Sequence, residues 1–442
     1  MSDAPSVEFA KRFRLALLLP MTVTKLRAAL SHALEHRRVT THNVKTIAQA
    51  VNDGRGVSAT EAAALRAFLD RHHDRFEPAA TTALNALLES APAAPKQSDT
   101  TPAVVDWATF SVPSSREQVT GSQRNEGLAT FDELAASVTS GVLGEADQLL
   151  LAAATARVGI MGEAQATRAV ARLAALDPAE RSAFQELANH AAPLERAFLY
   201  KALGAGSTPA EITAFAEAIH GWPNERLLTE LSLADAITTD GQQSGLIQQF
   251  NGSCVVTTAQ LLRGEVDPVY ALELRRQNPK LHDADEHDPF KLNPSLAKDQ
   301  GAQLDRAGGY PTPRIQGGVG VKHTVIDTLY NAHTDRSGFV YALSSIGDSP
   351  ELTTDVLLDR LANQLERGIP TPVLVGDSIS AKRHAMLALE VRGEGADQQF
   401  LLHDPWSGNT LEVSRQQFRD SSAPLGDFNR IGAIHVATPT PN

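Results

Sequence analysis

The chain has 442 residues, a length typical of two or three domains, and its 42% apolar and 21% charged residues are ordinary for a globular protein. The 40 lysines and arginines against 52 aspartates and glutamates give a net charge of −12, which argues against nucleic acid or an anionic membrane as a partner. A single cysteine excludes an internal disulfide framework and gives no sign of an oxidising compartment.

The N-terminus is only partly like a secretory signal. Basic residues precede the apolar run 15–20, but the run is short, Asp3 and Glu8 lie upstream of it, and no A-x-A cleavage site follows. No stretch of the sequence reaches the roughly 20 apolar residues of a membrane span. We therefore expect a helix stopped by Pro20 and no membrane span.

Changes in composition along the chain predict four segments. Residues 1–91 form an alanine-rich N-terminal helical region, with an S-x-x-E capping box at Ser58. Residues 92–126 are rich in Pro, Ser, Thr and Gln and lack periodicity, which is typical of a linker. Residues 127–239 are predicted to form a helical bundle, and residues 240–442 form a separable domain that carries the strands.

Local signals support helices within 127–239. Asp177-Pro178 and Thr208-Pro209 each supply an N-cap followed by a proline in the first helical position, and Gly221 is a C-terminal stop. Apolar residues recur there at three- and four-residue spacing, which indicates a packed bundle without chemistry of its own.

The segment 240–442 contains five β-type runs and one clear helix, 353–368, between the first two of them. The runs lie at 339–346, 371–377, 385–393, 399–404 and 431–437. Helices followed by strands predict an α+β domain with an antiparallel sheet.

Cys254 lies in the stretch QQFNGSCVVTT, where the turn-forming residues 251–253 precede an apolar helix that ends near Gly264. In the first turn of a helix, unsatisfied backbone N–H groups and the positive end of the helix dipole stabilise a thiolate. The alternative is a small buried residue on that helix. A base elsewhere in the chain would favour the nucleophile.

His384 and Asp404 are the candidate partners of Cys254. His384 begins one strand and Asp404 ends the next, and a short turn joins the two strands. Antiparallel pairing of the strands would place the two side chains next to each other. Asp404 could then accept the imidazole N–H and leave the other ring nitrogen facing the thiol. His384 would activate Cys254 and later protonate the leaving group.

An acyl-transfer site also needs hydrogen-bond donors for an oxyanion. Gln248 lies six residues before Cys254, and its amide could join the backbone N–H of Cys254 in this role. Gln249 is the alternative.

Taken together, Gln248, Cys254, His384 and the tripeptide Asp404-Pro405-Trp406 resemble the papain-fold cysteine peptidase superfamily. The stretches HAMLALEV and FLLHDPWSGNT are closest in style to its bacterial C39-like branch and to papain-like effector domains. The resemblance implies a helical lobe that carries the cysteine, an antiparallel β lobe that carries the histidine and aspartate, and a site in the cleft between them. It also implies that Trp406 covers the His–Asp pair.

These residues predict a cysteine protease that uses a Cys254-His384-Asp404 triad to cleave a peptide or isopeptide bond in a protein or peptide substrate, through a thioester. One alternative is the same triad used for deamidation or acyl transfer. Another is a non-catalytic papain-like protein that acts by interaction. No cofactor is expected, and the N-terminal helices either bind a partner or regulate the catalytic domain. The resemblance and the alanine- and arginine-rich composition indicate a bacterial protein, either cytoplasmic or exported without a cleaved Sec signal.

Three other features are interpreted as structural. His403 would point to the face of its strand opposite Asp404. The stretch HDADEHDPF, 282–290, matches no strong metal-binding spacing and is expected to be a solvated acidic loop, so no metal site is predicted. The glycine-rich stretch 307–323 lacks the Gly-Lys-Ser/Thr of a phosphate-binding loop and is either a substrate-side lid or a plain connection.

Overall fold

The computed structural model describes residues 39–51, 65, 69, 76–89, 119–137, 145–234, 245–346, 349, 351–376, 383–425 and 428–439. The chain divides into two compact units, residues 1–111 and 112–442. The Ser58 capping box and the helix stop at Pro20 lie outside the described residues, as do residues 92–118 of the predicted linker.

The first unit has a small helical core. Its named helices in the described part of the chain are α3 (Thr41–Val51) and α5 (Pro78–Glu89), which contact each other. A parallel bridge pairs Val39 with Phe76, and Ile47 of α3 is fully buried. The two helices therefore bury their apolar faces against each other, as amphipathic helices do.

The second unit begins with the predicted helical bundle. Its helices in the described residues are α6 (Gly121–Ser137), α7 (Glu145–Val158), α8 (Glu163–Ala175), α9 (Pro178–His190), α10 (Pro193–Gly204), α11 (Pro209–Ile219) and α12 (Asn224–Glu230). Asp177 and Thr208 form capping boxes at the starts of α9 and α11, so both predicted helix starts are confirmed. Because α6 begins at Gly121, residues 121–126 of the predicted linker are helical.

In the described residues, four further α-helices come between the bundle and the first strand in the sequence. They are α13 (Cys254–Val266), α14 (Pro268–Gln277), α15 (Pro294–Arg306) and α16 (Ile326–Thr334). The carboxylate of Asp267 caps α14, and Pro268 occupies its first position.

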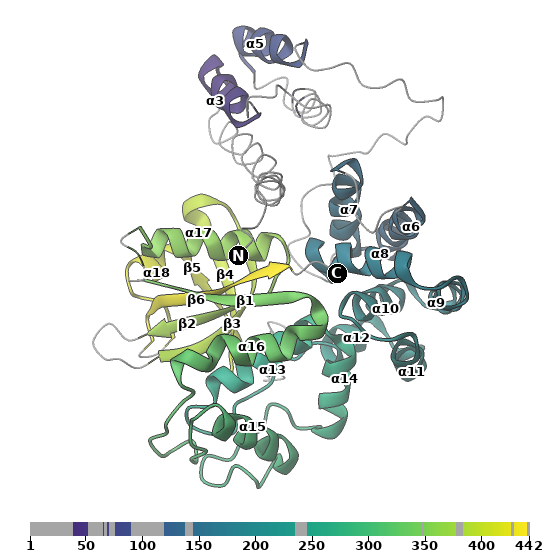
Figure 1. The fold of residues 1–442 in the computed structure, drawn as a ribbon. Helices are drawn as coiled ribbons and strands as arrows, with labels where there is room; N and C mark the ends of the chain where they lie inside the picture. The colour runs from purple at the N-terminus through teal and green to yellow at the C-terminus, as the bar shows by residue number, and fades with distance from the viewer. Residues whose placement is uncertain are drawn as a thin grey trace, which may run out of the picture. The chain divides into compact units, whose positions relative to one another are not determined.

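Within the described residues, the C-terminal part of this unit forms a six-stranded antiparallel sheet in the order β1-β6-β2-β3-β4-β5 (Figure 1). The strands are β1 (Phe339–Ser345), β2 (Thr371–Gly376), β3 (Arg383–Arg392), β4 (Gln399–Asp404), β5 (Asn409–Ser414) and β6 (Arg430–Pro439). Five strands coincide with the predicted runs, which confirms the α+β class and the antiparallel sheet. The sequence did not predict β5, because NTLEVS is short and mostly polar; it pairs in register with β4.

Helices cover both faces of the sheet. α13 and α16 lie on one face, and α17 (Thr354–Glu366) lies on the other (Figure 1). The short helix α18 (Arg415–Arg419) packs against α17. Side chains alternate accordingly: Leu374 of β2 packs toward the α13 side, and Val373 and Val375 pack toward the α17 side. The helix α13 therefore packs directly on the central strands β2 and β3.

The bundle is joined to the sheet region by close backbone contacts. A Cβ added to Gly162 would lie 2.4 Å from the carbonyl oxygens of Arg367 and Gly368, so only glycine fits there. The Gln165 amide donates a hydrogen bond to the Val266 carbonyl at the end of α13. Residues 112–442 form one compact unit, which contains both the bundle and the segment that carries the strands.

We expect the two halves of the second unit to fold only together. A chain beginning at residue 112 should be soluble and melt cooperatively. A chain beginning at residue 245 should aggregate, because it exposes the surfaces that Gly162 and Gln165 cover and leaves the Val266 carbonyl without its donor. Circular dichroism melting and size-exclusion chromatography of both chains test this. A fragment starting at residue 245 that is monomeric and melts cooperatively would instead show that the segment from about residue 240 folds as a separate domain.

Candidate active site

The turn before α13 positions Cys254. The Ser253 hydroxyl donates a hydrogen bond to the Phe250 carbonyl at 3.0 Å, which closes the turn. Gly252 has a φ of +80°, and a Cβ there would meet Gly320 at 3.0 Å, so the position requires glycine. Cys254 follows as the first residue of α13 and is 8% exposed. The thiol therefore lies at the start of a helix, on a turn with little conformational freedom.

The structure places His384 and Asp404 side by side, where β3 begins and β4 ends. β3 and β4 are antiparallel neighbours, and His384 Nε2 lies 2.6 Å from Asp404 Oδ1. The backbone N–H of Trp406 donates to the same carboxylate oxygen at 2.8 Å. The Phe428 ring stacks on the imidazole, with ring centres 5.2 Å apart. With Nε2 bound to Asp404, Nδ1 is the ring nitrogen left for another partner.

Cys254 and His384 lie close enough for each to shift the pKa of the other. Burial raises the pKa of the Cys254 thiol, but a hydrogen bond with His384 and the charge of its ring outweigh burial, and the pKa is lowered. Backbone N–H groups of Ala385 and Val255 add to the lowering. The pKa of His384 is shifted the opposite way: burial lowers it, but hydrogen bonds to Asp404 and Cys254 raise it overall. The two shifts together favour a thiolate–imidazolium pair.

Asp404 is held in its ionised form. Burial raises the pKa of this carboxyl, but the hydrogen bond and charge of His384 and the Trp406 N–H outweigh burial, and the pKa falls to about 2. The carboxylate can therefore orient the imidazole and balance its positive charge at neutral pH.

The structure separates the roles open to Gln248 and Gln249. Both are buried. The Gln248 amide donates one hydrogen bond, to the Phe250 carbonyl at 2.8 Å, on the turn that leads to Cys254. The Gln249 amide donates to the carbonyls of Asp283 and Ile247, at 3.1 and 3.5 Å. The Gln249 N–H groups are thus both engaged, whereas the bonds of the described residues leave one N–H of Gln248 unused.

Trp406 contacts the site through its backbone. Its N–H binds Asp404, while its ring lies on the guanidinium of Arg314 at 4.1 Å and is 38% exposed. Arg314 and Phe428 are two site neighbours that the sequence reasoning did not identify. Neither belongs to a motif, and no pattern in the sequence marks them.

The remaining candidate features have structural partners. His403 is fully buried on the face of β4 opposite Asp404, and its Nε2 lies 3.1 Å from the Leu246 carbonyl. In the loop 282–290, Asp285 accepts hydrogen bonds from His287 N and Lys291 Nζ. No group of metal-ligating side chains occurs among the described residues. The helices of the described part of the chain are all too short or too polar to cross a membrane.

The glycine-rich stretch 307–323 lies against the turn that precedes Cys254. The Asn251 N–H donates to the Thr312 carbonyl at 3.0 Å, and a Cβ on Gly318 would meet the Asn251 carbonyl oxygen at 2.6 Å. The stretch therefore packs on the turn that leads to Cys254.

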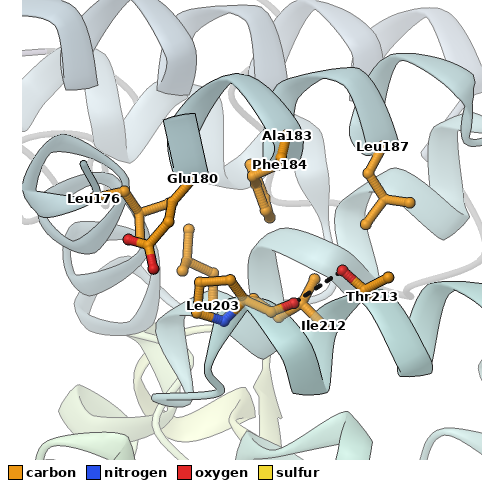
Figure 2. A pocket seen from close by; sticks show the side chains of 9 residues that line it. Leu176, Glu180, Ala183, Phe184, Leu187, Leu203, Ile212 and Thr213 are labelled. Atoms are coloured by element: carbon orange, nitrogen blue, oxygen red, sulfur yellow. Dashed lines mark hydrogen bonds between the residues drawn. The ribbon is translucent and has the colours of Figure 1, made fainter. Parts of the chain in front are cut away.

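A hollow on the bundle surface is unrelated to this site (Figure 2). It is lined mainly by apolar side chains of α9, α10 and α11, among them Phe184, Leu187, Leu203 and Ile212. Its volume of ≈ 30 Å³ would admit two or three waters at about 10–15 Å³ each. It is too small for an organic cofactor.

Replacing Asp404 with alanine should slow turnover by up to about 10⁴-fold, the loss known when the aspartate of a nucleophile–His–Asp triad loses its carboxylate. The reason is that the imidazole would lose the acceptor that fixes its orientation. The rates for wild type and variant should be compared with a common acyl substrate, together with thermal melts. Equal rates for wild type and variant would mean that Asp404 does not contribute to turnover.

Comparison of the sequence with protein-family models gives no match, and comparison with curated proteins gives none.

Proposed function

We propose that this chain is a papain-like cysteine hydrolase that cleaves a peptide or isopeptide bond in a protein or peptide substrate. The observation that carries the proposal is the pairing of His384 Nε2 with Asp404 Oδ1 at 2.6 Å next to a buried Cys254 at a helix start, with the pKa of the thiol lowered and that of the imidazole raised by each other. Desolvation and a specific charged partner that together shift pKa values in this way are typical of functional sites.

In this reaction the Cys254 thiolate attacks the scissile carbonyl carbon and forms a tetrahedral intermediate. The carbonyl oxygen becomes an oxyanion, which the backbone N–H at the start of α13 and the Gln248 amide would bind. The carbon–nitrogen bond then breaks, and the His384 imidazolium gives its proton to the leaving amine. Water, deprotonated by the now neutral His384, attacks the thioester and releases the acid and the thiol.

The arrangement of the elements supports the papain-like and C39-like resemblance. The cysteine begins a helix packed on one face of an antiparallel sheet, and the histidine and aspartate come from neighbouring strands of that sheet. Deamidation of a glutamine or transfer to another acceptor would pass through the same thioester and is the second candidate. A non-catalytic interaction protein is less well supported, because such a protein does not require a buried, polarised thiol.

The test is acylation of the full chain by p-nitrophenyl acetate, whose ester carbonyl forms an oxyanion without requiring a specific side chain. Release of p-nitrophenolate should show a burst equal to the amount of protein, and mass spectrometry should place one acetyl group on Cys254. Cys254→Ser should abolish the burst. A wild-type chain whose Cys254 is alkylated but never acylated would overturn the proposed hydrolase.

A further inference from the structure

Arg314 is a buried arginine in the loop that packs on the turn before Cys254. It is 8% exposed and lies in the glycine-rich stretch 307–323. Its Nη1 donates to the Gln248 carbonyl at 2.7 Å, and its Nη2 donates to the Trp406 carbonyl at 2.8 Å. The Arg314 guanidinium lies 4.1 Å from the centre of the Trp406 ring. The backbone carbonyl of Arg314 accepts a hydrogen bond from the Asn251 side chain at 3.1 Å.

These bonds join two loops that are far apart in the sequence. One loop carries Gln248 and leads to Cys254; the other follows Asp404 and contains Trp406. The loops also bond to each other directly, since the Gln248 N–H donates to the Pro405 carbonyl at 2.7 Å. Both backbone groups of Gln248 are therefore fixed, one by the loop after Asp404 and one by Arg314.

The burial of Arg314 is costly for the fold. Its two close acceptors are neutral carbonyls, and its Nε is buried with no hydrogen-bond partner among the described residues. Burial lowers the pKa of Arg314, and the charges of Glu286 and Asp404 only partly oppose this. A cation kept at such a position is typical of a site where geometry matters more than stability.

We propose that Arg314 is a positioning residue, which sets the Gln248 amide at a fixed distance from the His384–Asp404 pair by clamping the two loops together. This inference rests on the proposed hydrolase. A planar guanidinium suits the role because it can reach two carbonyls at once and still stack on an indole. A lysine ammonium lacks the rigid planar fork that can bridge two carbonyls and stack on the indole together.

Arg314→Ala should separate two reactions of Cys254. Acylation by p-nitrophenyl acetate builds an oxyanion and should fall ~10- to 100-fold, the size of loss that follows a small misplacement of a reacting group. Alkylation by iodoacetamide builds none and should stay within about twofold of wild type. Millimolar guanidinium should restore part of the acylation rate of Arg314→Ala by filling the vacated space. Arg314→Lys should remain slow, because its side chain keeps that space occupied.

Arg415→Ala is the matched control. Arg415 is also a buried arginine, 6% exposed, but it binds Gln398 and Asp359 away from the site. This variant should lose stability while keeping the ratio of acylation to alkylation, with no response to guanidinium.

Three results would overturn the inference. In the first, acylation by Arg314→Ala equals that of wild type. In the second, acylation and alkylation fall together, as a general loosening of the fold would cause. In the third, guanidinium has no effect. If Arg314→Ala does not fold, the same ratio measured on Arg314→Lys decides. A wild-type chain that cannot be acylated at all would overturn the proposed function and this inference together.

Discussion

Replacing His384 with alanine should reduce acylation of Cys254 at neutral pH by on the order of 10³-fold, within the range expected when a general acid–base is removed. His384 is the charged partner that lowers the pKa of the buried thiol. Without the imidazole, burial favours the neutral thiol. The variant also lacks the acid that would protonate the leaving group. Both the nucleophile and the proton donor are lost in one change.

The pH dependence of alkylation tests whether His384 lowers the pKa of the Cys254 thiol. In the wild type the pKa of Cys254 is lowered, so iodoacetamide should react well below the ordinary thiol pKa of about 8.5. In His384→Ala the rate should rise only at higher pH, because the thiolate then forms against the cost of burial. His403→Gln is a suitable control, since His403 is buried in the same strand pair but faces away from Asp404. The same pH profile in wild type and His384→Ala would mean that His384 does not activate the thiol.

The sequence predicted the His384–Asp404 pair because the relevant structure is local. Two strands joined by a short turn have a nearly fixed register, so the spacing between the residues determines that they meet. The start of α13 at Cys254 was also predictable, since turn residues followed by an apolar helical run mark a helix start. The approach of α13 to β3 is a tertiary contact, and only the resemblance to a known fold suggested it.

Other features depend on contacts that spacing cannot reveal. Gln248 and Gln249 are neighbours in the sequence and carry the same side chain. Only the fold shows that Gln248 bonds to Phe250 in the turn before Cys254, whereas Gln249 bonds to Asp283. The docking of the bundle depends on Gly162 meeting Gly368, two glycines that look like ordinary helix punctuation in the sequence. Arg314 was missed for the opposite reason: a charged residue in a glycine-rich loop is normally exposed, and this one is buried.

Replacing Gln248 with alanine should lower the acylation rate by on the order of 10²-fold or more, the loss typical of removing one oxyanion donor. The amide lies over the turn that leads to Cys254 and has one N–H engaged by Phe250. Its second N–H has no acceptor among the described residues, and we expect it to bind the incoming oxygen.

The companion measurement is alkylation by iodoacetamide, which should change little in Gln248→Ala because that reaction forms no oxyanion. Gln249→Ala is the matched control: it removes a buried amide of the same size one residue along, whose N–H groups already serve the carbonyls of Asp283 and Ile247. It should cost stability and leave the ratio of acylation to alkylation unchanged. Equal losses of both reactions in Gln248→Ala would assign that residue to the fold, and a selective loss in Gln249→Ala would move the oxyanion donor to the neighbouring amide.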